Sequence, residues 1–293
     1  MQPVRALFHL IATWVSWLPW SVLRELGAAL GWLVGSVVRV RRREVVDRIE
    51  RAGFHSAELV ASAMYTSLGT GLFELLAISA DTRPIASRVE LTERAREVFE
   101  RIRHRGAIVA TAHTGCWDLV GCAMAELAPL CVVTKRLSVG SLDRVWQASR
   151  RRRGIRLIEA RGALAAARDA MSRGELVVFP IDQVPERDSG VLIHPFLGHL
   201  ARHDMAPALL AARLRVPLVL ALGRRVGEKH VIDVRLVADP RDAHVLRDES
   251  PRSWIVSTTR RAADALGEFI REEPAQWLWL HRRWKGVVVD TSK

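Results

Sequence analysis

Short apolar runs recur through the middle of the chain, and stretches of helical character separate most of them. The runs are "AIVATA" (107–112), "LCVV" (130–133), "IRLIE" (155–159), "LVVF" (176–179) and "LVLAL" (218–222). A continuous apolar run is typical of a strand buried on both faces, and helices between such strands cover the faces of a parallel sheet. The pattern therefore predicts an α/β fold with a largely parallel central sheet flanked by helices.

Further elements surround this predicted core. We expect a charged amphipathic helix over 44–56, a mostly apolar helix over about 57–80, a helix over 92–105 and a final long helix over 252–273. The run "HVIDVRLV" (230–237) predicts an edge strand. The chain shows no internal repeat and no low-complexity linker.

The N-terminus is the most apolar part of the chain. Residues 6–23 contain no Asp, Glu, Lys or Arg, and a second such run covers 26–38. Eighteen residues are near the minimum for crossing a bilayer, so the first run either spans the membrane or forms, with the second, a buried or interfacial helical hairpin broken near Pro19. A cleaved signal peptide is disfavoured because Arg24 and Glu25 interrupt the approach to any cleavage site.

An arginine cluster follows this apolar segment directly, at Arg39, Arg41, Arg42 and Arg43. Positive charge beside a membrane segment marks the cytoplasmic side. We therefore expect a membrane-associated helical segment over 1–40 and one further domain over 41–293, on the cytoplasmic side.

The overall charge points to an anionic partner. The chain has 44 Lys and Arg against 32 Asp and Glu, a net charge of +12. Nucleic acid, anionic lipid headgroups and phosphorylated ligands all fit this balance. A basic nucleic-acid-binding protein on a membrane anchor is the alternative function from a different class. No nucleic-acid-binding motif is present, however, and the aromatic residues do not alternate with basic ones, so we expect no nucleic acid partner.

Most of the ten tryptophans gather near the two ends of the chain, at Trp14, Trp17, Trp20, Trp32, Trp254, Trp277, Trp279 and Trp284. Tryptophan favours the headgroup level of a bilayer, so both ends are candidates for membrane contact. For the C-terminal set, an ordinary core position is an equal alternative.

The stretch "ATAHTGCWDLVG" (110–121) is the clearest candidate for chemistry. His113 ends a predicted strand, Gly115 permits a tight turn, and Asp118 falls in the first turn of the helix that follows. An aspartate reaching back to the imidazole would fix its tautomer and leave the other nitrogen free to take a proton from a hydroxyl. Ser141 and the three cysteines lack any activating motif, so the substrate would supply that hydroxyl. The alternative is a histidine with a purely structural role.

Several motifs resemble one family when taken in order. Besides "HTGCWD", an HxxxxD pattern, they are "KRLSVGSLDRVW", "RRRRGIRLIEARGAL", "GELVVFPIDQ", "GVLIHPFLG" and "PAQWLWLHRRWK". The ordered set resembles the lipid A biosynthesis acyltransferases, the lauroyl and myristoyl transferases, and the related mycobacterial phosphatidylinositol mannoside acyltransferases. The resemblance covers most of the chain.

This resemblance implies a glycerolipid-acyltransferase-like fold, with an N-terminal apolar anchor and an acyltransferase domain over 41–293. It implies transfer of a fatty acyl group from an acyl carrier protein or coenzyme A thioester, without a cofactor, to a hydroxyl of a lipid A precursor or similar glycolipid. A phosphatidylinositol mannoside or another phospholipid is the alternative acceptor. The expected location is the cytoplasmic face of the bacterial inner membrane. The apolar helix over 57–80 would be a core helix or a wall for the acyl chain.

The resemblance also suggests site residues. His113 would be the general base and Asp118 its orienting carboxylate, while Arg161 and Arg136 would stabilise a phosphate or an oxyanion. "FPIDQ" lacks the Glu, Gly and Arg of the FPEGTR motif of the glycerolipid enzymes, which argues against a glycerol-3-phosphate or lysophosphatidate acceptor. Asp182 should lie at the same sheet margin as His113 and bind acceptor hydroxyls or an arginine, with a structural salt bridge as the alternative.

Three other groups receive weaker interpretations. His199 and His203 are four residues apart, but no third ligand accompanies them, so we predict no metal site there. The arginines at 150–153 are read as a solvated helix end, with contact to phosphates or to an acidic carrier protein as the alternative. "HRRWK" (281–285) is either an interfacial anchor or a solvated basic patch.

Overall fold

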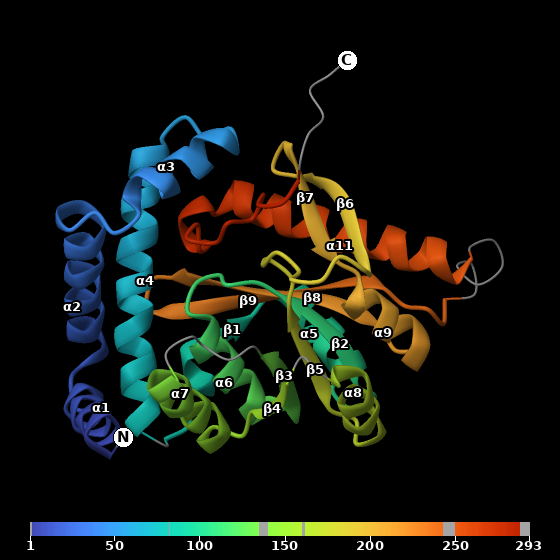
Figure 1. Ribbon diagram of the computed structural model, residues 1–293. Coiled ribbons are helices and arrows are strands. Elements are labelled where there is room, and N and C mark those ends of the chain that lie inside the picture. The colour runs from blue at the N-terminus through green and yellow to red at the C-terminus, as the bar shows by residue number, and fades with distance from the viewer. Residues whose placement is uncertain (1, 82, 135–139, 160–161, 243–249, 288–293) are drawn as a thin grey trace.

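A seven-stranded sheet forms the centre of the computed structural model (Figure 1), which describes residues 2–81, 83–134, 140–159, 162–242 and 250–287. The strand order is β1-β9-β8-β2-β5-β3-β4. The strands are β1 (Val89–Leu91), β2 (Ala107–Thr111), β3 (Leu130–Thr134), β4 (Arg156–Glu159), β5 (Leu176–Pro180), β8 (Leu218–Val226) and β9 (Lys229–Ala238). All pairs are parallel except β8 with β9, which confirms the predicted α/β class.

Side chains of the central strands alternate between two apolar cores. In β2, Ala107 and Val109 belong to one core, whereas Ile108 and Ala110 belong to the other. The first core is covered by α5 (Glu93–Ile102) and α6 (Trp117–Leu127), and the second by α8 (Ala163–Ser172), α9 (Ala206–Leu214) and α11 (Pro251–Glu272). Burial on both faces is the reason these strands read as continuous apolar runs.

The prediction that 230–237 forms an edge strand is wrong. β9 pairs with β8 on one side and with the short strand β1 on the other. Val89 of β1 lies opposite His230, and the parallel pairing ends at Leu91. β1, and not β9, is the edge strand on this side of the sheet. Its three residues are too few to give a strand signal in the sequence.

A separate antiparallel hairpin was not predicted. It consists of β6 (Val191–Phe196) and β7 (His199–Asp204). Leu197 and Gly198 form its turn with φ of 50° and 85°, the left-handed geometry of a two-residue hairpin loop. The hairpin packs against α11.

The N-terminal helices form a layer along one side of the molecule (Figure 1). They are α1 (Gln2–Ser16), α2 (Trp20–Trp32), a π-helical turn (Leu33–Val37), α3 (Arg42–Arg51) and α4 (Ala57–Ala80), and α7 (Gly140–Arg152) packs nearby. The chain breaks between α1 and α2 at Pro19, as predicted, so 6–23 is not one helix. Instead of forming a hairpin with each other, α1 and α2 both pack on α4.

Among the residues that the structure describes, α4 is the single helix long and apolar enough to be a candidate for crossing a membrane. One third of its most apolar window is buried inside the protein, and core helices of soluble proteins meet the same criteria. The pair formed by 20–37 and α3 also qualifies together but bends by 89°.

Glycines let α2 and α4 approach backbone to backbone. A Cβ on Gly31 would lie 2.1 Å from the carbonyl oxygen of Tyr65, and one on Gly69 would lie 2.1 Å from the carbonyl oxygen of Gly27. No side chain fits at such distances, because the colliding atoms are backbone. This contact joins residues on both sides of position 40 into one layer.

The close approach predicts unequal effects of two glycine substitutions. Gly31→Ala should destabilise the protein by about 2 kcal/mol, because α2 must move away from α4. Gly71→Ala should be neutral or stabilise it by up to about 1 kcal/mol, because its Cβ would be 3.7 Å from the nearest atom and alanine favours helix. Urea unfolding followed by tryptophan fluorescence measures both. Equal changes in the free energy of unfolding for the two variants would contradict the close backbone contact between α2 and α4.

Candidate active site

The parallel register of β2 and β5 brings His113 to Asp182. Thr111 pairs with Pro180 at the ends of these neighbouring strands. His113 and Asp182 each follow two residues later, so both emerge at the carboxyl edge of the sheet. Reactive groups in open α/β sheets gather at this edge.

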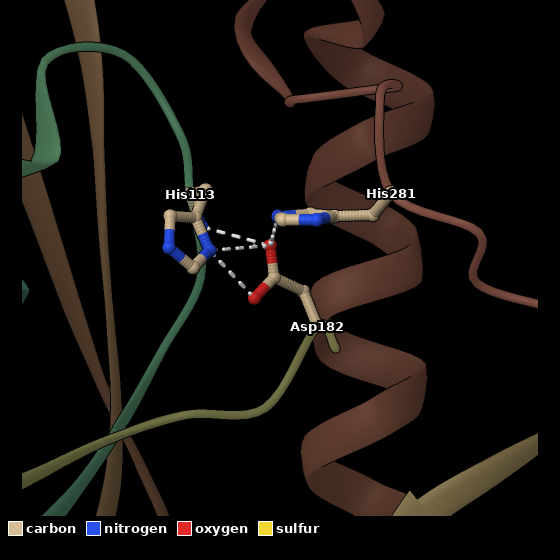
Figure 2. A group of neighbouring side chains, drawn as sticks. All are labelled: His113, Asp182 and His281. Atoms are coloured by element: carbon tan, nitrogen blue, oxygen red, sulfur yellow. Dashed lines mark hydrogen bonds and ion pairs between the residues drawn. The ribbon is translucent and has the colours of Figure 1, made fainter. Parts of the chain in front are cut away.

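The two side chains are directly hydrogen-bonded. His113 Nδ1 lies 3.0 Å from Oδ1 and 3.1 Å from Oδ2 of Asp182, and the backbone N–H of His113 donates to Oδ2 at 2.9 Å. Trp277 Nε1 donates to the same Oδ2 at 3.1 Å. Figure 2 shows the second ring nitrogen of His113, Nε2, pointing away from the carboxylate.

Burial and charge act in opposite directions on this pair. Burial disfavours the charged ring of His113, but the charge of Asp182 and its hydrogen bond prevail, so the pKa of His113 is raised above its usual value. Burial opposes the ionisation of Asp182 too, but His113 holds the pKa of that carboxyl well below its usual range. Asp182 is therefore an anion at neutral pH, which suits Nδ1–H as donor and Nε2 as the free base.

The segment after α11 holds the loop that carries His113. Leu278 donates its N–H to the carbonyl of His113 at 3.1 Å, and Gly115 donates to the carbonyl of Gln276 at 2.8 Å. Gly115 has φ of +54°, which allows the tight turn expected of it. The C-terminal segment thus forms one wall of the site.

His281 belongs to the same wall. Its ring lies edge-on to that of His113, with centroids 4.8 Å apart, and its Nε2 is 3.8 Å from Asp182 Oδ2 (Figure 2). That nitrogen is buried and has no hydrogen-bond partner among the described residues. Burial, only partly opposed by the charge of Asp182, lowers the pKa of His281 to about 4. His281 is therefore neutral at physiological pH.

Asp118 does not contact the imidazole as the sequence suggested. Its Oδ1 accepts a hydrogen bond from Arg150 Nε at 2.7 Å and another from Trp146 Nε1 at 3.0 Å, and both donors belong to α7. Asp118 still favours the charged form of His113 through its negative charge. The spacing suggested a local pair, but the carboxylate that orients His113 comes from the neighbouring strand.

The other predicted substrate-binding residues have different outcomes. Asp182 lies at the expected margin, but its side chain is 0% exposed and is occupied by His113 and Trp277 instead of facing acceptor hydroxyls. Arg136 and Arg161 lie outside the described residues. His199 and His203 both lie on the strand β7, but their side chains have different partners. The ring of His203 contacts Arg283, whereas His199 Nε2 lies 2.6 Å from the carbonyl oxygen of Arg51.

The arginines at 150–153 are not simply a solvated helix end. Arg150 is paired with Asp118, and Arg153 is buried and donates to three backbone carbonyls, at Ile78, Asp81 and Arg83. Arg151 and Arg152 are exposed.

The "HRRWK" segment is not uniformly solvated: Arg282 and Lys285 are exposed, but Arg283 is buried. Arg283 is 1% exposed and donates to the carbonyl of Arg202 and to His203 Nδ1. Trp254, Trp277 and Trp279 are buried in the core, which settles the C-terminal alternative for these three. No pattern in the sequence marked His281, Trp277 and Arg283 as site residues, although all three lie in the last motif of the resemblance.

A cavity of about 1210 Å³ adjoins the free face of His113. Asp118, Trp117, Trp146 and Arg150 line it near the imidazole. Apolar side chains line much of the remainder, among them Phe99, Ile102, Met124, Leu130, Val219 and Ile232. Three further arginines, Arg187, Arg213 and Arg252, also line it. A mostly apolar cavity with few polar groups suits a small amphiphilic ligand.

One group of side chains has the donor set of a metal site. His113, Asp182 and His281 each offer a ligand atom, and these atoms lie within 4.8 Å of one another. Two imidazoles and a carboxylate suit a transition metal. Here, however, the carboxylate already accepts hydrogen bonds from the backbone and ring of His113 and from Trp277. These hydrogen bonds to Asp182 favour a role of the group in proton transfer over a role as metal ligands.

Comparison with known proteins identifies the family of the chain. A family model described as bacterial lipid A biosynthesis acyltransferase matches residues 3–286, which includes the N-terminal helices, the His113 loop and the C-terminal wall. A search of curated proteins found no match. The chain therefore belongs to the bacterial lipid A biosynthesis acyltransferase family.

Proposed function

We propose that this acyltransferase moves a fatty acyl group from an acyl carrier protein or coenzyme A thioester to a hydroxyl of a lipid A precursor or a similar glycolipid. One observation carries the proposal: His113 is hydrogen-bonded through Nδ1 to a buried aspartate, and its ring lines a large, mostly apolar cavity. Its other nitrogen points away from the carboxylate (Figure 2) and has no hydrogen-bond partner in the part of the chain that the structure describes. A phosphatidylinositol mannoside or another phospholipid is the alternative acceptor.

The reaction needs one proton to move twice. His113 Nε2 takes the proton of the acceptor hydroxyl as its oxygen attacks the thioester carbonyl carbon. The tetrahedral oxyanion then collapses, the carbon–sulfur bond breaks, and the leaving thiolate takes the proton from Nε2. Asp182 stabilises the imidazolium between these steps without itself being protonated.

Direct transfer is consistent with the state of the cysteines. Cys116, Cys122 and Cys131 are buried. Burial raises the pKa of the Cys116 thiol well above its usual value and raises those of Cys122 and Cys131 to about 12. A thiolate nucleophile is therefore disfavoured at neutral pH, and no acyl-enzyme is required.

Asp118 acts indirectly in this mechanism. It holds the Arg150 guanidinium at the cavity wall beside the imidazole, where a cation stabilises an oxyanion or a phosphate. Arg136 and Arg161 remain proposed for the same role. Arg213 and Arg252 suit the anionic parts of the donor carrier, whereas Arg187 is already paired with Asp204.

We place the protein at the cytoplasmic face of the bacterial inner membrane. Trp14, Trp17 and Trp32 are 64%, 75% and 58% exposed, an unusual degree for tryptophan away from a lipid interface. Arg39 and Arg41, which follow the π-helical turn after α2, are exposed as well and suit anionic headgroups. Cell fractionation should recover the protein with the membranes, and recovery in the soluble fraction would contradict this placement.

The central test replaces the proposed base. His113→Ala should reduce acyl transfer by on the order of 10³-fold, and Asp182→Asn by on the order of 10²-fold, because the base or its orienting charge is lost. Mass spectrometry of membrane lipids should show one acyl chain missing from one glycolipid, which would name both donor chain and acceptor. His55→Ala, at an exposed histidine, is the control. Full activity of a folded His113→Ala protein would refute the mechanism.

A further inference from the structure

A smaller cavity of about 290 Å³ lies between α2 and α4, behind the loop that follows His113. Leu30 of α2 and Val34 of the following π-helical turn line one side of it, and Leu68, Leu72 and Leu75 of α4 line the other. Gly115, Cys116 and Trp117 close its inner end. We call this cavity the α2/α4 groove.

The groove and the large cavity share a wall. Trp117, Asp118 and Trp146 line both. The Trp146 indole is held to Asp118, and the ring of Trp117 lies edge-on to that of His113 with centroids 4.9 Å apart. A chain lying in the groove would therefore end beside the catalytic imidazole.

The outer rim of the groove belongs to the exposed apolar surface. Leu72 lines the groove from α4 and is 45% exposed. On the other wall, Trp32 and Leu33 lie between the groove-lining residues Leu30 and Val34 and are 58% and 43% exposed. A hydrocarbon chain can pass from a bilayer over such a rim without contacting a polar group.

Charge distinguishes the two cavities. Among the described residues, four arginines and two aspartates line the large cavity; Asp118 and Asp204 pair with Arg150 and Arg187, so Arg213 and Arg252 give it an excess of positive charge. In the same part of the chain, Asp118 is the one ionised group that lines the α2/α4 groove. An acyl thioester arrives on a phosphorylated, anionic carrier, so its entry suits the arginine-lined cavity. The acceptor arrives within the membrane, so its apolar part suits the groove.

We infer that the α2/α4 groove binds a hydrocarbon chain of the lipid acceptor, while the large cavity receives the acyl chain of the donor. The inference rests on the proposed function and assigns separate sites to the two substrates. On this inference the α2/α4 groove contributes to substrate selection, because an acceptor must itself carry a hydrocarbon chain to occupy it.

Two glycines allow a matched test. A Cβ on Gly71, which lines the groove, would lie 3.7 Å from Cys116; a Cβ on Gly121, which lines the large cavity, would lie 3.7 Å from Ile155. Both glycines are helical and neither has a positive φ, so each tolerates a side chain. Gly71→Leu fills the groove, and Gly121→Leu fills part of the large cavity.

The probe is a phospholipid with a photoreactive diazirine at the end of one acyl chain, incorporated in anionic vesicles with the full-length protein. After irradiation, peptide mass spectrometry should find adducts on residues 68–75 and 115–117. Gly71→Leu should reduce these adducts by roughly tenfold or more, and Gly121→Leu should leave them unchanged. Added palmitoyl coenzyme A should not compete. Thermal unfolding checks that both variants fold, and Gly71→Ala provides a milder variant.

Three results would overturn the inference: adducts confined to the outward faces of α1 and α2, adducts unaffected by Gly71→Leu in a folded protein, or displacement by palmitoyl coenzyme A. His113→Ala should reduce transfer by on the order of 10³-fold and leave the groove adducts intact. A wild-type protein that gives the groove adducts but transfers no acyl group would refute the proposed function and not the chain site.

Discussion

The hydrogen bond between His113 and Asp182 is the interaction on which the site depends, and the register of two parallel strands creates it. β2 and β5 lie side by side at the centre of the sheet, and each ends two residues before its functional side chain. Both strands are buried on two faces, so a slip in their register would disturb both apolar cores. The sheet thereby brings together a histidine and a carboxylate that are 69 positions apart.

Other parts of the chain adapt this pair to its surroundings. The segment after α11 binds the His113 loop through backbone hydrogen bonds and supplies Trp277 to the buried carboxylate. Asp118 does not contact the His113 ring. Its carboxylate accepts hydrogen bonds from Arg150 and Trp146, and these side chains form a polar wall between the two cavities. The HxxxxD pattern thus places its histidine at the proposed proton-transfer site and its aspartate in the wall between the two cavities.

The sequence predicted the central strands well because burial on both faces leaves a continuous apolar run. It also placed His113 and Asp182 at one margin, since both follow such runs. It could not show which carboxylate reaches the imidazole, because sequence spacing favours Asp118 while strand register favours Asp182. The burial of Arg283 and Trp277 depends on distant partners, so "HRRWK" resembled a surface patch. The three-residue β1 and the hairpin turn at Leu197 left signals too short to recognise.

Titration of His113 by ¹⁵N NMR of the histidine-labelled protein tests the central claim most directly, with His113→Ala to assign the signal. The pKa of His113 should lie above its ordinary value of about 6.5, and the neutral ring should carry its proton on Nδ1. Asp182→Asn should lower this pKa, because burial then outweighs the remaining charges, and the fall should exceed that in Asp118→Asn. A larger fall in Asp118→Asn, or a neutral ring protonated on Nε2, would contradict the pairing of His113 with Asp182.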